Sequence, residues 1–224
     1  MIIDIITLLP KFWKYSIKYH PIINKAIIKK LIKINIFNLK KYGIKKGKKI
    51  YIDDYQYGGG YGMILKIEPI YNCISSLKKK YDYIIFLTPD SKIYNQNDAI
   101  KLSKKKKILF ICGHYKGIDQ RVRDYIITKE YSIGKYILSN GDLSTLIVID
   151  TIIRLIPGVI GNIKSTYTDT FNNNSYEHPL YTRPYNFKNM IVPKILLSGN
   201  HTKINKWRKK KIKKKIKLLN KGTK

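Results

Sequence analysis

The sequence predicts an α/β protein with a parallel central sheet, followed by a small basic helical region at its C-terminal end. Short continuous apolar runs recur at residues 2–9, 83–88 and 108–112, with segments of helix length between them. Runs of this kind are typical of parallel strands that are buried on both faces. Beyond Gly161 the chain first becomes polar and then strongly basic, which indicates a separate region.

The elements of the N-terminal part follow from local patterns. Residues 2–9 end at a proline and fit a central strand. Residues 22–37 have a mixed pattern that favours a helix followed by a strand. Residues 53–62, DDYQYGGGYG, are too rich in glycine for regular structure. Residues 83–88 and 108–112 stop at a proline and at a glycine, so we expect each strand to end in a loop.

The C-terminal part divides into a linker and a basic helix. Residues 162–176 are rich in asparagine, serine and threonine, which favours a flexible linker. Two proline-punctuated turns follow, and residues 204–219 then have helical apolar spacing among lysines. We therefore expect a domain at 1–161, a linker at 162–176 and a basic helical domain at 177–224.

The chain carries a formal net charge of +31, from 45 lysines and arginines against 14 aspartates and glutamates. So much positive charge repels itself unless a polyanion binds, and RNA or DNA is the default polyanion. Lysine, isoleucine, asparagine and tyrosine are heavily used, as in proteins of AT-biased genomes. Part of the lysine excess can therefore be drift on solvated faces.

The sequence also argues against several other classes of protein. Cys73 and Cys112 lie in apolar surroundings without metal-ligand or disulfide spacing, which favours a reducing compartment. The N-terminus carries Asp4 and no basic stretch, so it resembles a strand more than a signal peptide. No apolar run reaches transmembrane length. We expect a soluble cytoplasmic protein without a metal site or a membrane partner.

Residues 108–161 carry the strongest functional signal. Two apolar runs break into glycine-bearing loops at residues 112–114 and 139–141, and a third apolar stretch contains Arg154 before it breaks at residues 157–158. Glycine lets a backbone approach a ligand closely, and α/β proteins bind ligands where strands end in such loops. The segment therefore predicts a binding site.

Several collinear motifs identify a resemblance over residues 1 to about 207. In order they are IITLLP, DDYQYGGGYGM, CGHYKGIDQRV, YSIGKYILSNGDL, IPGVIG, HPLYTRP and LLSGNH. With them the chain resembles the bacterial tRNA (guanine-N1)-methyltransferases of the TrmD type. The resemblance implies transfer of a methyl group from S-adenosylmethionine to N1 of the guanosine at position 37 of tRNA. It also implies a SPOUT-type sheet with a trefoil knot, and a homodimer whose active sites lie at the subunit interface.

By this resemblance Asp169 is the base that removes the N1 proton, and Arg154 neutralises charge on the guanine. A carboxylate suits the first role because protonated N1 is a poor nucleophile. Taken alone, the sequence around Asp169 favours a solvated loop carboxylate, and it is the resemblance that favours the base. Arg154 could equally be a residue whose stem packs while its head reaches solvent.

The resemblance places the methyl donor in the loops that follow successive strands. Backbone groups there would read the adenine edge, glycines would admit the ligand, and apolar side chains would form the walls. Each loop by itself could be an ordinary left-handed turn. The matching positions are Leu87, Pro89, Gly113, Tyr115, Ile133, Gly134, Lys135, Tyr136, Ile137, Leu138 and Gly141.

Two segments are expected to contact RNA. The glycine-rich loop lacks the Lys-Ser/Thr ending of a P-loop, and the resemblance assigns it to the guanosine side of the site. The basic tail could bind RNA, a membrane surface or an acidic partner, and the resemblance favours tRNA phosphates. The residues concerned are Asp54, Gly58, Gly59 and Gly60 in the loop, and Lys206, Arg208, Lys209 and Lys210 in the tail.

The chain departs from the usual family pattern near the donor loops. His114 and Lys116 stand where arginine and glutamate are usual, and the usual GGELP is NGDLS. Lys116 reverses a charge beside a cationic donor. These changes motivate an alternative, a basic RNA-binding protein that keeps the knot but has weakened or lost catalysis. The survival of Arg154, Asp169 and Gly113 together favours the enzyme.

Overall fold

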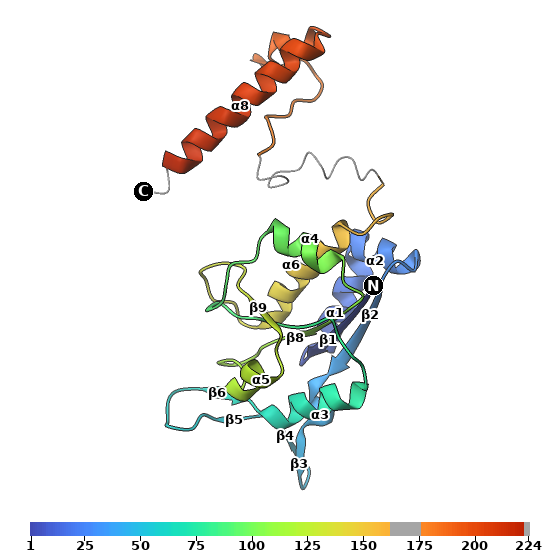
Figure 1. The fold of residues 1–224 in the computed structure, drawn as a ribbon, viewed down its shortest axis with the longest axis vertical. Coiled ribbons are helices and arrows are strands. Elements are labelled where there is room, and N and C mark those ends of the chain that lie inside the picture. The colour runs from blue at the N-terminus through green and yellow to red at the C-terminus, as the bar shows by residue number, and fades with distance from the viewer. Residues whose placement is uncertain (162–175, 222–224) are drawn as a thin grey trace. The chain divides into compact units, whose positions relative to one another are not determined.

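The computed structural model describes residues 1–161 and 176–221, with side chains described as far as Leu218. The chain divides into two compact units, Met1–Gly161 and Asn162–Lys224. We call them unit 1 and unit 2 and describe each by itself (Figure 1). Apart from Tyr176, the predicted linker lies outside the described residues.

Unit 1 is built on a five-stranded sheet in which every strand pair is parallel, which confirms the predicted α/β class. The apolar runs predicted as strands form its centre, and a short strand at the edge was not predicted. That edge strand has only three residues, too few to show the alternation of apolar and polar residues that marks a strand in the sequence. The strands, in their order across the sheet, are β2 (Lys33–Asn38), β1 (Ile2–Thr7), β8 (Lys107–Ile111), β7 (Tyr83–Leu87) and β9 (Lys129–Tyr131).

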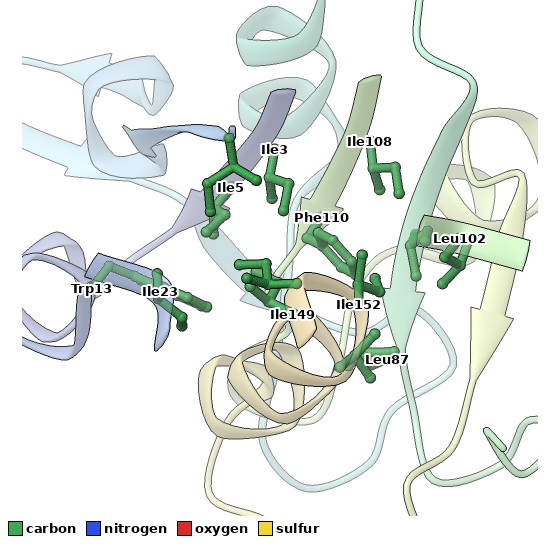
Figure 2. Close-up of a cluster of buried hydrophobic side chains, with 14 of the residues drawn as sticks. Ile3, Ile5, Trp13, Ile23, Leu87, Leu102, Ile108, Phe110, Ile149 and Ile152 are labelled. Carbon is green, nitrogen blue, oxygen red and sulfur yellow. The ribbon is translucent and has the colours of Figure 1, made fainter. Parts of the chain in front are cut away.

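Helices cover both faces of the sheet, because alternate residues of the central strands are apolar on each side. In β8, Ile108 and Phe110 belong to one buried cluster, whereas Leu109 and Ile111 belong to the other. The first cluster, shown in Figure 2, receives side chains from α1 (Pro10–Tyr19), α2 (Pro21–Ile28), α4 (Gln96–Ser103) and α6 (Gly141–Arg154). The second receives them from η1 (Leu39–Tyr42), α3 (Ile67–Leu77) and α5 (Gln120–Tyr125).

Two antiparallel hairpins join β2 to α3. The first pairs β3 (Ile44–Lys46) with β4 (Lys49–Tyr51). The second pairs β5 (Asp53–Tyr55) with β6 (Met63–Leu65) around the glycine-rich loop. The prediction that residues 53–62 lack regular structure was therefore wrong for the first three. Short strands gain their stability from pairing across the hairpin, which local composition does not reveal.

Unit 2 ends in a long basic helix, α8 (His201–Lys221). The helix begins after Asn200, whose side-chain oxygen accepts a hydrogen bond from Lys203 N at 3.0 Å and so caps the first turn. Trp207 packs 6.4 Å from Tyr181, measured between ring centroids, and Lys211 lies over the Trp207 ring at 5.5 Å. This confirms the predicted helix. The smaller elements are β10 (Asn186–Phe187), β11 (Met190–Ile191) and η3 (Lys194–Leu197).

Two further features concern the cysteines and the length of the helices. Cys73 and Cys112 are both free thiols and are buried in opposite core clusters. Among the residues that the structure describes, none of the helices is long and apolar enough to span a membrane.

Candidate functional site

A cavity of about 400 Å³ lies at the carboxyl ends of three neighbouring strands, β7, β8 and β9. Its walls are residues 86–89, residues 113–117 and the chain from Ser132 to the first turn of α6. This volume is in the range of small-molecule sites, and parallel strands commonly present ligands at their carboxyl ends. The geometry of unit 1 therefore singles out this edge of the sheet.

Most of the residues predicted to bind the methyl donor meet at this cavity, although they come from three separate segments. The lining residues among them are Leu87, Pro89, Gly113, Tyr115, Ile133, Gly134, Tyr136, Ile137, Leu138 and Gly141. Lys135 does not line it. The residues thus form one concave surface, and the identity of its ligand stays a prediction.

Gly113 and Gly141 are required by the protein's own packing. Gly141 N donates to the Gly113 carbonyl at 2.8 Å, and a Cβ on Gly141 would stand only 2.7 Å from Gly113 N. A Cβ on Gly113 would stand 2.9 Å from the Phe86 ring. The sequence suggested glycines that make room for a ligand. In the structure they let the start of α6 sit against the loop that follows β8.

The loop after β8 presents a strained residue and a cation to the cavity. Tyr115 has a φ of 58°, a left-handed conformation that is uncommon for a tyrosine and often marks functional loops. Burial and the nearby Asp53 carboxylate raise the pKa of the Tyr115 phenol. Lys116, the charge reversal noted in the sequence, lines the cavity and is exposed, so water screens its charge.

A buried carboxylate joins the cavity to the core. Asp142 Oδ1 accepts hydrogen bonds from Thr7 Oγ1 at 2.5 Å and from the Trp13 indole at 2.6 Å. Its Oδ2 lies 2.9 Å from Nε2 of His114, a cavity residue with an 11% exposed side chain. Burial raises the pKa of Asp142, but the His114, Thr7 and Trp13 contacts outweigh burial and hold it below the usual value.

The sequence drew attention to His114 and Asp142 only as departures from a family pattern, and it missed their pairing. They lie 28 positions apart, and no local spacing connects them to Thr7 or Trp13. The available signal was weak. Both residues lie within residues 108–161, His114 in one glycine-bearing loop and Asp142 directly after the other, and both are changes from the family pattern.

A second missed group fixes the wall formed by Thr88 and Pro89. Arg123 in α5 holds Glu130 of β9 through two hydrogen bonds of 2.7 and 2.8 Å. The same guanidinium donates to Asp90 at 3.0 and 3.4 Å. Hydrogen bonds from Thr88 and from Arg123 lower the pKa of Asp90, so that carboxylate stays charged near neutral pH. Arg123 therefore ties the loop after β7 to α5 and β9.

Of the two predicted catalytic residues, the structure describes only Arg154, which lies away from the cavity of its own chain. Gly141, at the start of α6, lines the cavity, whereas Arg154 is the last residue of that helix and is exposed. Because an α-helix rises about 1.5 Å per residue, Gly141 and Arg154 lie about 20 Å apart along the helix axis. One chain does not bring Arg154 to its own cavity. Asp169 lies outside the described residues.

The predicted RNA contacts occupy exposed surfaces in both units. Asp54 belongs to β5 and pairs with Lys66 at 3.0 Å, and this hydrogen bond lowers the pKa of Asp54. The glycines at 58–60 are exposed and have positive φ. Lys206, Arg208, Lys209 and Lys210 are exposed on α8. In the part of the chain that the structure describes, no three His, Cys, Asp or Glu side chains gather as metal ligands would.

Comparisons with known proteins agree with the motifs. The family model described as tRNA (guanine-1)-methyltransferase TrmD matches residues 1–221. A tRNA (guanine-N(1)-)-methyltransferase from Christiangramia forsetii is 50% identical over 210 residues, which cover 93% of this chain and 92% of the relative. The protein of the same name from Flavobacterium johnsoniae is 48% identical with the same coverage. One from Listeria monocytogenes is 42% identical over 94% of this chain and 86% of the relative.

Proposed function

Because this chain belongs to the TrmD family of tRNA (guanine-N1)-methyltransferases, we propose that its cavity binds S-adenosylmethionine for methylation at position 37 of tRNA. The chain is a tRNA methyltransferase by family, and its reaction requires a methyl donor. One observation supports S-adenosylmethionine as the ligand of this cavity. Ten residues that match the family's donor-binding positions come from three segments and line one cavity.

The residues of the cavity fit a nucleoside-containing donor. Leu87, Ile133 and Leu138 provide apolar walls, and backbone groups of the loop segments would meet the adenine edge. The tight contact between Gly113 and Gly141 fixes two of these loops against each other. The donor would supply a methyl group on a positively charged sulfur, which leaves with the bonding electron pair.

The chain's own residues would carry the proton chemistry. Asp169 would accept the proton from guanine N1 as that nitrogen forms its bond to the methyl carbon. Loss of this proton leaves negative charge on the guanine, mainly at O6. Arg154 would donate hydrogen bonds to O6 and stabilise that charge.

The position of Arg154 supports a dimeric site. Arg154 and the cavity of the same chain stand at opposite ends of α6, about 20 Å apart. An arginine that acts on the guanine must reach a cavity, so we propose that it reaches the cavity of a second copy. Asp169 follows the same helix by 15 residues in the chain and would accompany Arg154.

We also propose the SPOUT trefoil knot for unit 1. The chain after β7 and the chain after β9 are bonded to each other, with Tyr94 N donating to Ser132 O and Ser132 N donating to Lys92 O, both at 2.8 Å. The start of α6 packs against the loop after β8. Three loops that interlock in this way support threading of the chain, although knots are nearly absent from proteins in general.

The exposed lysines and Arg208 of α8 would bind tRNA phosphates, and the β5–β6 loop would face the RNA beside the target guanosine. Phosphate contacts give affinity with little base readout, so the choice of base falls to the cavity and its surroundings. The alternative of a binding protein without catalysis is not favoured, because the matched relatives are named as methyltransferases.

A transfer assay tests this proposal. The purified protein is incubated with labelled S-adenosylmethionine and unmodified tRNA, with guanosine or adenosine at position 37. We expect transfer only to the guanosine form, and a loss of roughly 10²- to 10⁴-fold for Asp169→Ala because a positioned base contributes about that much. Absence of transfer by the unmutated protein would refute the assignment.

The same assay tests the dimeric site. A cavity variant, Gly141→Val, is mixed with Asp169→Ala after dissociation and reassociation of the copies. If one copy provides the cavity and the other provides the base, mixing restores transfer that neither variant has alone. Continued inactivity of a mixture shown to contain hybrid dimers would contradict sites shared between copies.

A further inference from the structure

Three strongly exposed tyrosines lie at the end of β5 and in the loop of the β5–β6 hairpin. Tyr55 is 77% exposed, Tyr57 is 101% exposed and Tyr61 is 94% exposed. Aromatic rings contribute most when they are buried, so a group of them held in water points to a partner that covers them. The glycines between them have positive φ, which lets the loop present the rings without other bulk.

The base of this hairpin is fixed to the wall of the cavity. Lys116 N donates to Met63 O, and Leu65 N donates to Gly117 O, each at 3.0 Å. A Cβ on Gly62 would stand 2.8 Å from Cγ of Lys116, so the loop end contacts a cavity residue directly. The tyrosines therefore belong to the surroundings of the cavity.

A cationic hairpin lies next to the tyrosines. Residues 39–52 contain six lysines and no acidic residue. Lys45, Lys46, Lys48 and Lys49 are all exposed on the β3–β4 hairpin. Ile52 alone separates that hairpin from β5, and both hairpins extend from the same end of unit 1 (Figure 1).

We propose that Tyr55, Tyr57 and Tyr61 form a stacking platform for unpaired RNA bases beside the cavity, while the β3–β4 lysines hold the phosphates of the same strand. Aromatic rings next to a basic track are the usual means of binding single-stranded nucleic acid, because every base has a flat face that can stack. The partner is thus the loop segment of the substrate RNA around the methylated guanosine. This inference rests on the proposed function and adds the surface that holds the neighbouring bases.

The charge around the tyrosines argues for this occupant. An acidic protein partner would satisfy the lysines but would leave three flat faces without a matching group. A second copy of the chain would bring more lysines to a surface that is already cationic. A strand of bases and phosphates satisfies both features at once.

The test compares matched pairs of exposed tyrosines. Tyr57→Leu/Tyr61→Leu removes two rings from the platform, and Tyr15→Leu/Tyr19→Leu removes two from α1, where they are 64% and 69% exposed. Binding of unmodified tRNA should weaken about tenfold or more in the first variant and stay unchanged in the second. Tyr57→Phe/Tyr61→Phe keeps the rings and should bind as the unmutated protein does.

A direct readout uses tRNA that carries 2-aminopurine beside the target guanosine. Its fluorescence should be quenched by the unmutated protein and by the phenylalanine variant, and it should stay bright with the leucine variant. Undiminished tRNA binding by the leucine variant would overturn the platform. So would dissociation of the copies by that variant in sedimentation, because the tyrosines would then be an interface between copies.

S-Adenosylmethionine binding separates the two proposals. All four proteins should bind the donor equally, because the tyrosines lie outside the cavity. If the unmutated protein does not bind it, the proposed function fails. If donor binding is intact and the leucine variant binds tRNA normally, only the platform fails.

Discussion

Asp142 links the cavity to the hydrophobic core through three side chains. Thr7 comes from β1, Trp13 from α1 and His114 from the loop after β8, and all three meet a carboxylate that is 1% exposed. A buried charge is tolerated only when hydrogen bonds replace the lost water. Asp142 also stands in the first turn of α6, where the helix dipole favours an anion.

We expect Asp142→Asn to lower the free energy of unfolding by about 1.5–3 kcal/mol near neutral pH, the usual contribution of hydrogen bonds to a charged group. The folded pKa of Asp142 lies below its usual 3.8, so the stabilisation is present above pH of about 4 and is lost as pH falls through the folded pKa. Denaturant unfolding of both proteins between pH 2.5 and 7 measures this. A stability difference that stays constant across that range would contradict it.

Arg123 connects three parts of unit 1 through side-chain hydrogen bonds. Its guanidinium lies on α5, Glu130 belongs to β9, and Asp90 belongs to the loop whose neighbours Thr88 and Pro89 line the cavity. It also lies 5.9 Å from the centre of the Phe86 ring, another cavity residue. The planar guanidinium suits this position because it can donate to two carboxylates at once.

We expect Arg123→Gln to weaken donor binding by about fivefold, because the wall at Thr88 and Pro89 loses its tether to α5. A fivefold loss of affinity corresponds to about 1 kcal/mol of binding free energy. This is a modest contribution because water partly screens the charged groups involved. Titration calorimetry with S-adenosylmethionine measures it, and kcat at saturating donor should change little.

Arg121→Gln is the matched control for this substitution. Arg121 lies on the same helix, two residues away, and pairs only with Asp119 among the ion pairs of the described residues. That side chain is 58% exposed, so its loss should not alter donor affinity. Equal losses in both variants would show that general charge, and not the tether, sets the affinity.

The sequence predicted the central sheet because runs such as 83–88 and 108–112 reveal burial on both faces within a few residues. It did not predict β9 or the β5–β6 hairpin, because three-residue strands carry no period and depend on their partners. The same reason explains which parts of the candidate site could be predicted from the sequence. Cavity loops were predictable from glycines and motifs, whereas the contacts of Arg123 and Asp142 join positions between 7 and 135 residues apart.

The positive residues behind the net charge of +31 are spread over the chain. Whether a given lysine contributes to tRNA binding therefore depends on where it lies. Lys209, Lys210 and Lys213 are exposed on α8, in unit 2. Lys101, Lys104 and Lys106 are equally exposed near the N-terminal end of β8, in unit 1. The cavity lies at the carboxyl ends of the strands, the opposite edge of the sheet. Only lysines that contact phosphate release counterions when tRNA binds.

The dependence of tRNA affinity on salt therefore separates functional lysines from drift. A triple glutamine variant at 209, 210 and 213 should lower the slope of log affinity against log salt by about one for each phosphate that the variant no longer neutralises. A triple variant at 101, 104 and 106 removes the same charge and should leave the slope unchanged. Filter binding between 50 and 300 mM salt measures all three proteins. If the slope falls equally in the two variants, tRNA responds to the overall charge, and α8 has no special part in binding.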